Sequence, residues 1–392
     1  MVDGFDVERL YSNVLELQGM RSHLFNQENL DKTADKINEK MENIGLDVYE
    51  HTFTVNGTNT IFRNIVGTCG DVDNNEAIVI VAHYDGANYS PAANDNAASI
   101  AAMLEVACQL IKHENPPAVY FLACTLEEGS PETRGQEMKN AIKFNIMDSN
   151  LIYTSLQNMK YCKLINSEVR NIYSISGEEI SKVYERTKKK YDDVLSEDLK
   201  AYLNENAKLF QGLNIYNMNE KDVCVGSTKW LADTLKAGKR IKCCIALDEM
   251  GIASDKEESQ APFSPEEISM IKSHKVDFER CVGNFEAVIS TDNSKALGNA
   301  FIESCKIKDI DLPYAWFDLP GNFDWCVQNF SAGLSSDHFA FVKNNIPSIF
   351  VTDTSYMRAV FLHTRADTID KVNFDHLLKV TKAIYYTVVT IK

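Results

Sequence analysis

The sequence of 392 residues has few basic residues for its size and no long apolar run. Lys and Arg number 40 against 56 Asp and Glu, which gives a formal net charge of −16 at pH 7. This deficit argues against nucleic acid as a partner, because phosphate binding needs clustered Lys and Arg. No window approaches the roughly 18 consecutive apolar residues of a membrane span. Since the N-terminus also lacks the basic and apolar segments of a signal peptide, we expect a cytoplasmic protein with no membrane partner.

The cysteines also lack a metal or redox pattern. There are ten, and no CxxC pair occurs among them, so neither a zinc ribbon nor a thioredoxin-type motif is indicated. Several lie in apolar runs, such as "VYFLAC" (119–124) and "IKCCIAL" (241–247). We therefore expect buried free thiols rather than disulfides, in agreement with a cytosolic protein.

What the sequence does contain is an alternation of strand and helix patterns. Continuous apolar runs, typical of strands buried on both faces of a parallel sheet, lie within residues 77–82, 116–129, 241–251 and 345–353. Apolar residues at helical spacing occur within residues 29–45, 96–111 and 377–388. This order predicts an α/β fold with a mostly parallel mixed sheet flanked by helices.

One long segment interrupts the alternation. Residues 130–225 are rich in Lys, Glu, Asn and Tyr, with recurring apolar positions and few Gly or Pro. We interpret them as a mainly helical subdomain inserted into an α/β domain made of residues 1–129 and 226–392. The insert either forms a wall or lid of a cleft or mediates self-association. The sequence does not distinguish these two roles. A smaller excursion at 254–285 is predicted to contain an exposed loop.

Three of the predicted strands end on side chains that can bind a metal. Ligands of open α/β sheets bind at the carboxyl ends of the strands. Taken singly these residues have ordinary explanations, such as Asp95 as a helix N-cap. Two adjacent carboxylates directly after a buried strand are nevertheless costly unless a cation or proton compensates them. The candidates, in chain order, are His83, Asp85, Asp95, Glu127, Glu128, Asp248 and His363.

Zinc chemistry accounts for this set of residues. Neutral imidazole and carboxylate oxygen are both suitable ligands for Zn²⁺. Two zinc ions about 3.5–4 Å apart can share one bridging carboxylate and activate a water. The sequence supplies two histidines, a bridging acid, two further acids and one free carboxylate, and therefore predicts two zinc ions per chain and no organic cofactor.

The order of the motifs resembles a zinc aminopeptidase family, M28, over about residues 20–130 and 226–392. In the related dimeric M20 peptidases the bridging Asp lies much farther from the H-x-D motif than the ten residues between Asp85 and Asp95 here. Three departures are Ala98-Ser99 in place of the usual Ser-Gly, Glu249 at a commonly apolar position, and the long insert at a junction that the family normally crosses in a few residues. The matching motifs are His83-Tyr84-Asp85, Asn94-Asp95-Asn96-Ala97, Glu127-Glu128-Gly129, Leu247-Asp248 with Gly251, Ser336-Asp337-His338 with Phe341, and His363-Thr364 with Asp367-Thr368.

The resemblance implies a role for several of the matching residues. One zinc would be held by His83, Asp95 and Asp248, and the other by Asp95, Glu128 and His363, with Asp95 bridging. Glu127 would be the general base for a zinc-bridging water, and Asp85 would orient His83. Asp337 and His338 are expected near the substrate site, with a helix cap as the equally open alternative for Asp337.

The implied function is a di-zinc metallo-exopeptidase, most simply an aminopeptidase, acting on a peptide or small amide. The alternative is a zinc acyltransferase similar to glutaminyl cyclases, which share the fold but keep one zinc. A non-catalytic binding module is disfavoured, because it would have no chemical need for Glu127. Side-chain preference and the end from which cleavage proceeds stay open, and the aromatics of 312–335 either line a pocket or pack a loop.

Overall fold

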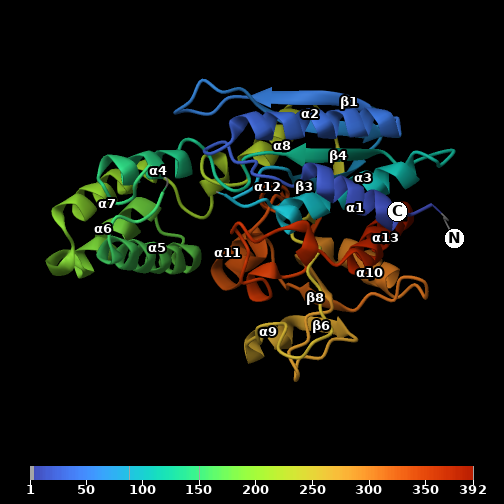
Figure 1. Cartoon of the computed structure of the whole chain (residues 1–392). Helices are drawn as coiled ribbons and strands as arrows, with labels where there is room; N and C mark the ends of the chain where they lie inside the picture. Colours follow the sequence, from blue (N-terminus) through green and yellow to red (C-terminus); the bar gives the residue numbers. More distant parts are fainter. Residues whose placement is uncertain (1–3, 88, 150, 392) are drawn as a thin grey trace.

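The computed structural model describes residues 4–87, 89–149 and 151–391, and its centre is one nine-stranded sheet (Figure 1). The order of the strands across the sheet is β1-β2-β4-β3-β5-β9-β7-β8-β6. Their bounds are β1 Asp47–Phe53, β2 Phe62–Cys69, β3 Ala77–His83, β4 Val119–Cys124, β5 Ile241–Leu247, β6 Ile271–His274, β7 Glu286–Ser290, β8 Tyr314–Asp318 and β9 Ser348–Thr352.

The sheet is parallel at its centre and antiparallel toward its edges. The four strands predicted from apolar runs are the adjacent strands β4, β3, β5 and β9, and each pairs with its neighbour in parallel. Outside this block the pairing is antiparallel, apart from the parallel pair of β7 and β8. The predicted α/β class, with a mixed sheet flanked by helices, is confirmed.

Helices cover both faces of the sheet because the strand residues alternate between two cores. Ile78 and Ile80 of β3 belong to the larger core, while Val79 and Val81 belong to the core on the opposite face, with Trp230. The larger core takes helices α1 Val7–Leu17, α2 Gln27–Ile44, α3 Ser99–Leu110, α10 Lys295–Cys305 and α13 Phe374–Thr390. The smaller one takes α8 Val225–Lys236 and α12 His338–Lys343.

The predicted helices are present, with boundaries set by local chemistry. α2 begins after Asn26, whose side chain accepts the Asn29 amide at 3.1 Å, and ends at Gly45, whose φ of 97° suits a residue without Cβ. The helix predicted at 96–111 is α3, but it starts later, at Ser99, because the backbone at Asp95 and Asn96 is not helical. The predicted C-terminal helix lies within α13.

Residues 134–209 form a separate layer of four helices. These helices are α4 Arg134–Lys143, α5 Leu156–Ser176, α6 Ile180–Lys190 and α7 Glu197–Leu209. Ile165, Val169, Val183 and Leu203 are buried in a hydrophobic cluster of their own, apart from the clusters that pack on the sheet. In Figure 1 this green layer lies beyond the end of the sheet toward which the β4 arrow points. The domain boundaries and a role as lid or association element stay predictions.

The excursion at 254–285 is more ordered than a loop. α9 (Pro265–Met270) starts with a capping box between Ser264 and Glu267, and β6 follows it directly. β6 pairs antiparallel with β8 and so forms one edge of the sheet. Within the described residues, no helix combines the length and apolarity needed to cross a membrane.

Candidate metal centre

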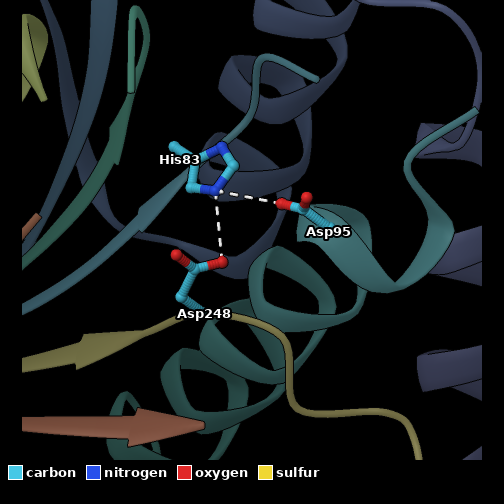
Figure 2. Close-up of side chains that lie close together, drawn as sticks. All are labelled: His83, Asp95 and Asp248. Atoms are coloured by element: carbon cyan, nitrogen blue, oxygen red, sulfur yellow. Dashed lines mark hydrogen bonds and ion pairs between the residues drawn. The ribbon is translucent and has the colours of Figure 1, made fainter. Parts of the chain in front are cut away.

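Three adjacent strands bring the predicted ligands together. His83 is the last residue of β3, Asp248 directly follows β5, and Glu127 and Glu128 follow β4 after two residues. Because β4, β3 and β5 are parallel neighbours, their carboxyl ends lie at one edge of the sheet. Asp95 reaches the same edge from the turn that begins the helical segment after β3. Figure 2 shows three of these side chains converging.

The first group of candidate ligands is centred on the His83 ring. Its Nε2 lies 3.2 Å from Asp248 Oδ1 and 3.3 Å from Asp95 Oδ1 (Figure 2). The other ring nitrogen, Nδ1, donates to the backbone carbonyl of Asp85 at 3.1 Å. That bond fixes the ring so that Nε2 faces the two carboxylates.

The second group shares Asp95 with the first. His363 Nε2 lies 2.9 Å from Asp95 Oδ2 and 3.4 Å from Glu128 Oε1. Asp95 therefore directs one carboxylate oxygen to each group. Within each group, the ligand atoms lie within 4.8 Å of one another, which suits one metal ion per group. The His363 side chain is 47% exposed whereas that of His83 is 1% exposed, so the second position opens to solvent.

The residues present fit a pair of divalent cations. Asp95, Glu127 and Asp248 are buried next to one another, and Glu128 Oε1 is a buried oxygen with no hydrogen bond in the described part of the chain. Burying several carboxylates together is costly unless positive charge compensates them. Imidazole nitrogen with carboxylate oxygen is a donor set that zinc accepts.

Crowding of the acids shifts their protonation in the metal-free chain. Burial, reinforced by the charge of Asp95, raises the pKa of Glu128 to about 8, and burial also raises the pKa of Glu127 well above its usual value. The charge of Glu128 raises the pKa of His363 to about 10. The cluster thus attracts positive charge, which protons supply in the absence of a cation.

Glu127 is placed by Asp85 and by a thiol. The Asp85 carboxylate accepts the backbone N–H groups of Glu127 at 3.3 Å and Glu128 at 3.2 Å. Glu127 Oε2 lies 3.9 Å from His83 Nε2, and its Oε1 accepts the Cys224 thiol at 3.4 Å. Asp85 therefore positions the acid pair through its carboxylate and His83 through its carbonyl, which extends the role expected from the sequence.

The loop that carries Asp95 is fixed by polar side chains to which the sequence analysis gave no role. Asp367 accepts the backbone N–H groups of Asn94 at 2.9 Å and Asp95 at 3.3 Å. Asn96 donates to the Leu247 carbonyl at 2.9 Å, which ties the loop to the end of β5. The motif Asn94-Asp95-Asn96 thus places one ligand between two residues that clamp its backbone.

A second clamp lies beneath Asn94. The Asn94 side-chain oxygen accepts the Gly251 N–H at 2.7 Å, and its Nδ2 donates to Asp353 Oδ2 at 3.2 Å. Asp353 also accepts the Ile252 N–H at 2.6 Å. The loop after β5, which carries Asp248, is therefore held against the loop that carries Asp95.

Arg21 is a further residue that the sequence did not indicate. Its guanidinium is buried and, among the described residues, donates only to backbone carbonyls, including those of Tyr84 at 2.7 Å and Ala92 at 2.9 Å. Burial lowers its pKa to about 10, against the attraction of Asp367 and Asp95. Arg21 thereby joins the strand end that carries His83 to the loop that carries Asp95.

The two residues predicted near the substrate site have different environments. Asp337 is buried and accepts Ser227 Oγ at 2.6 Å and Cys124 Sγ at 3.0 Å, and its side chain makes no helix-capping bond. Burial raises its pKa to about 6. His338 is buried against Phe350 and donates from Nε2 to a backbone carbonyl, and its expected place near the substrate site stays a prediction.

Comparison with known proteins agrees with the motifs. The family model described as Peptidase family M28 matches residues 64–276 and 323–388, which together make up more than half of the chain. The chain belongs to peptidase family M28. A curated relative is the uncharacterized protein YfbL of Escherichia coli, 32% identical over 125 residues, but the match covers 30% of this chain and only 38% of that protein.

Several solved structures share the fold of this chain. LapB from Legionella pneumophila is 15% identical to this chain with a TM-score of 0.57, and the match covers 99% of this chain and 72% of LapB. A glutaminyl cyclase from Fimbriiglobus ruber is 15% identical with a TM-score of 0.56, covering 100% and 97%. A leucine aminopeptidase precursor from Bacteroides thetaiotaomicron is 13% identical with a TM-score of 0.55, covering 100% and 99%. At these identities the likeness establishes the fold alone.

Proposed function

We propose that this M28 chain is a zinc-dependent metallo-exopeptidase that releases the terminal residue of peptides, most simply as an aminopeptidase. The observation that carries the proposal is Asp95, which directs Oδ1 to His83 and Oδ2 to His363, at the centre of two three-residue ligand groups. His83, Asp95 and Asp248 would hold one zinc, and Asp95, Glu128 and His363 the other. Bound zinc would lower the pKa of a water and polarise the scissile carbonyl.

The chain's own groups supply the proton transfer. Glu127 Oε2 lies 3.9 Å from His83 Nε2, so this carboxylate can accept a proton beside the first ligand group. The same carboxyl group can then deliver that proton to the departing amine. Asp85 holds the backbone at Glu127 and Glu128, which keeps the base and the adjacent ligand in fixed relation.

A glutaminyl cyclase-like acyltransferase is the second candidate. Its specific support is that a glutaminyl cyclase matches this chain over nearly its whole length, with a TM-score within 0.01 of that of LapB. The complete set of five ligands favours two ions and hence hydrolysis, because it forms two three-residue groups that share Asp95; the set is His83, Asp95, Glu128, Asp248 and His363. Bound zinc therefore separates the candidates: a hydrolase should hold two zinc ions per chain after dialysis, and a cyclase one.

The activity test is a panel of aminoacyl anilides, dipeptides and N-terminal glutaminyl peptides, each assayed with zinc and with a chelator. We expect zinc-dependent release of the amino-terminal residue. Glu127→Gln should abolish turnover while two zinc ions stay bound, and the exposed acid of α9 provides a matched control in Glu266→Gln, which should keep full activity. Cyclisation of the glutaminyl peptides without anilide release would select the second candidate. Unchanged turnover by Glu127→Gln would overturn the mechanism.

A further inference from the structure

The two ends of the inserted helical layer meet directly beside Glu127. We call this junction the neck and define it as residues 125–134 and 221–227. Thr133 Oγ1 donates to Asp222 Oδ1 at 2.6 Å, and the Arg134 guanidinium lies 3.3 Å from the same carboxylate. Asp222 is buried, so these contacts join the entering and leaving segments of the insert in a water-poor environment.

Backbone bonds continue the neck up to the acid pair. The N–H groups of Cys224, Val225 and Gly226 donate to the carbonyls of Glu127, Leu126 and Thr125 at 3.2, 3.0 and 3.1 Å. Gly226 is required for this approach, because a Cβ there would lie 2.2 Å from the Thr125 carbonyl oxygen. The segment that leaves the insert is therefore in register with the segment that carries Glu127.

The Cys224 side chain adds a contact to the Glu127 carboxylate. The thiol is buried and donates to Glu127 Oε1 at 3.4 Å, while Oε2 faces His83. Burial raises the pKa of the Cys224 thiol, so it retains the proton that it donates. A carboxylate with one oxygen held by a donor has fewer orientations available, and the free oxygen is directed at the ligand cluster.

We infer that Cys224 is a positioning residue for Glu127, and that through it the attachment of the insert sets the orientation of the base. This inference rests on the proposed function, because it assigns Glu127 as the base. It also gives the neck a role in catalysis that a wall or an association element alone would not have.

A thermodynamic cycle tests the contact without zinc and without activity. Cys224→Ala, Glu127→Ala and the double variant are unfolded in urea in the presence of a chelator. If the thiol and carboxylate interact, the double variant's shift in unfolding midpoint differs from the sum of the single shifts. Cys305→Ala, which truncates a buried cysteine of α10, should be additive with Glu127→Ala. Additivity of Cys224→Ala would overturn the contact.

Kinetics test the positioning role. Cys224→Ala should lower kcat about tenfold, with KM and bound zinc unchanged, because a misplaced base costs rate rather than substrate affinity. Cys224→Ser keeps a donor and should recover most of the loss, whereas Cys305→Ala should not change kcat. Equal kcat values for Cys224→Ala and the parent, or equal losses for Ala and Ser, would overturn the inference. Absence of zinc-dependent turnover in the parent would instead refute the proposed function, while the urea cycle would still report on the contact.

Discussion

Acid should destabilise this protein partly through His338, a residue placed in the core rather than at the metal centre. Its Nε2 donates to the Gly333 carbonyl at 2.7 Å, and its ring stacks on Phe350 with 4.7 Å between centroids. The other nitrogen, Nδ1, is buried and has no partner in the described residues. A proton added to Nδ1 would therefore be placed without an acceptor in an apolar environment.

The magnitude follows from the shift in pKa. Burial lowers the pKa of His338 from 6.5 to about 4, so the unfolded chain binds the proton more readily than the folded one. Its contribution to stability is complete above about pH 6.5 and is lost as the pH falls toward 4. At about 1.4 kcal/mol per unit, the loss between pH 7 and pH 4.5 amounts to about 2 kcal/mol.

The assay compares the parent with His338→Phe, which keeps an aromatic ring on Phe350 and cannot titrate. At pH 7 the variant should be about 1 kcal/mol less stable in urea unfolding, because the bond to Gly333 is lost. At pH 4.5 the order should reverse. Both proteins are measured without metal. Because they share the other histidines, the titration of those histidines cancels in the difference between the two stabilities at each pH. A stability difference that does not change between the two pH values would refute the burial of Nδ1. Zinc-dependent turnover at pH 7 should be unaffected.

Three further predictions concern the centre itself. Asp95→Ala should reduce bound zinc from two ions to less than one per chain, whereas His363→Ala should keep one ion. Elemental analysis after dialysis measures the zinc content of both variants. Equal losses of zinc in the two variants would refute the bridging role of Asp95. Arg21→Met should lower the free energy of unfolding by about 3 kcal/mol, because several buried carbonyls lose their donor, and a urea midpoint like the parent's would contradict this. Asp337→Asn should leave zinc content unchanged, since Asp337 bonds Ser227 and Cys124; loss of one ion would make it a ligand.

Much of the centre could be predicted from the sequence because the sheet topology brings the ligand residues together. Once residues 77–82, 119–124 and 241–247 are recognised as adjacent parallel strands, their carboxyl ends must meet, and the residues that follow them must be neighbours. His83, Asp248 and the acid pair follow from this rule alone. His363 does not, because a loop after the last strand delivers it; its residue type and the family motif indicated it, and the strand rule did not.

The side of the sheet that contains β7, β8 and β6 was harder to predict for a physical reason. β7 and β8 are short, and the region before them contains a charged segment that reads as a loop. β6 contributes Ile271, Lys272, Ser273 and His274, a sequence without a continuous apolar run, since an edge strand with exposed side chains needs none. Such a strand is defined by its partner β8, and pairing partners far apart in the chain leave no local pattern.

The residues that position the ligands could not be predicted from the sequence for a related reason. They also show which parts of the fold set the orientation of the ligands. Arg21, Asp353 and Cys224 act on atoms that lie 63 or more positions away in the chain, through contacts to backbone carbonyls, backbone amides and a carboxylate. Neither the residue type nor the spacing in the sequence indicates such contacts. A ligand motif transplanted into another sheet would therefore keep its donors and lose their orientation, because the donors are specified locally and their geometry by the whole fold.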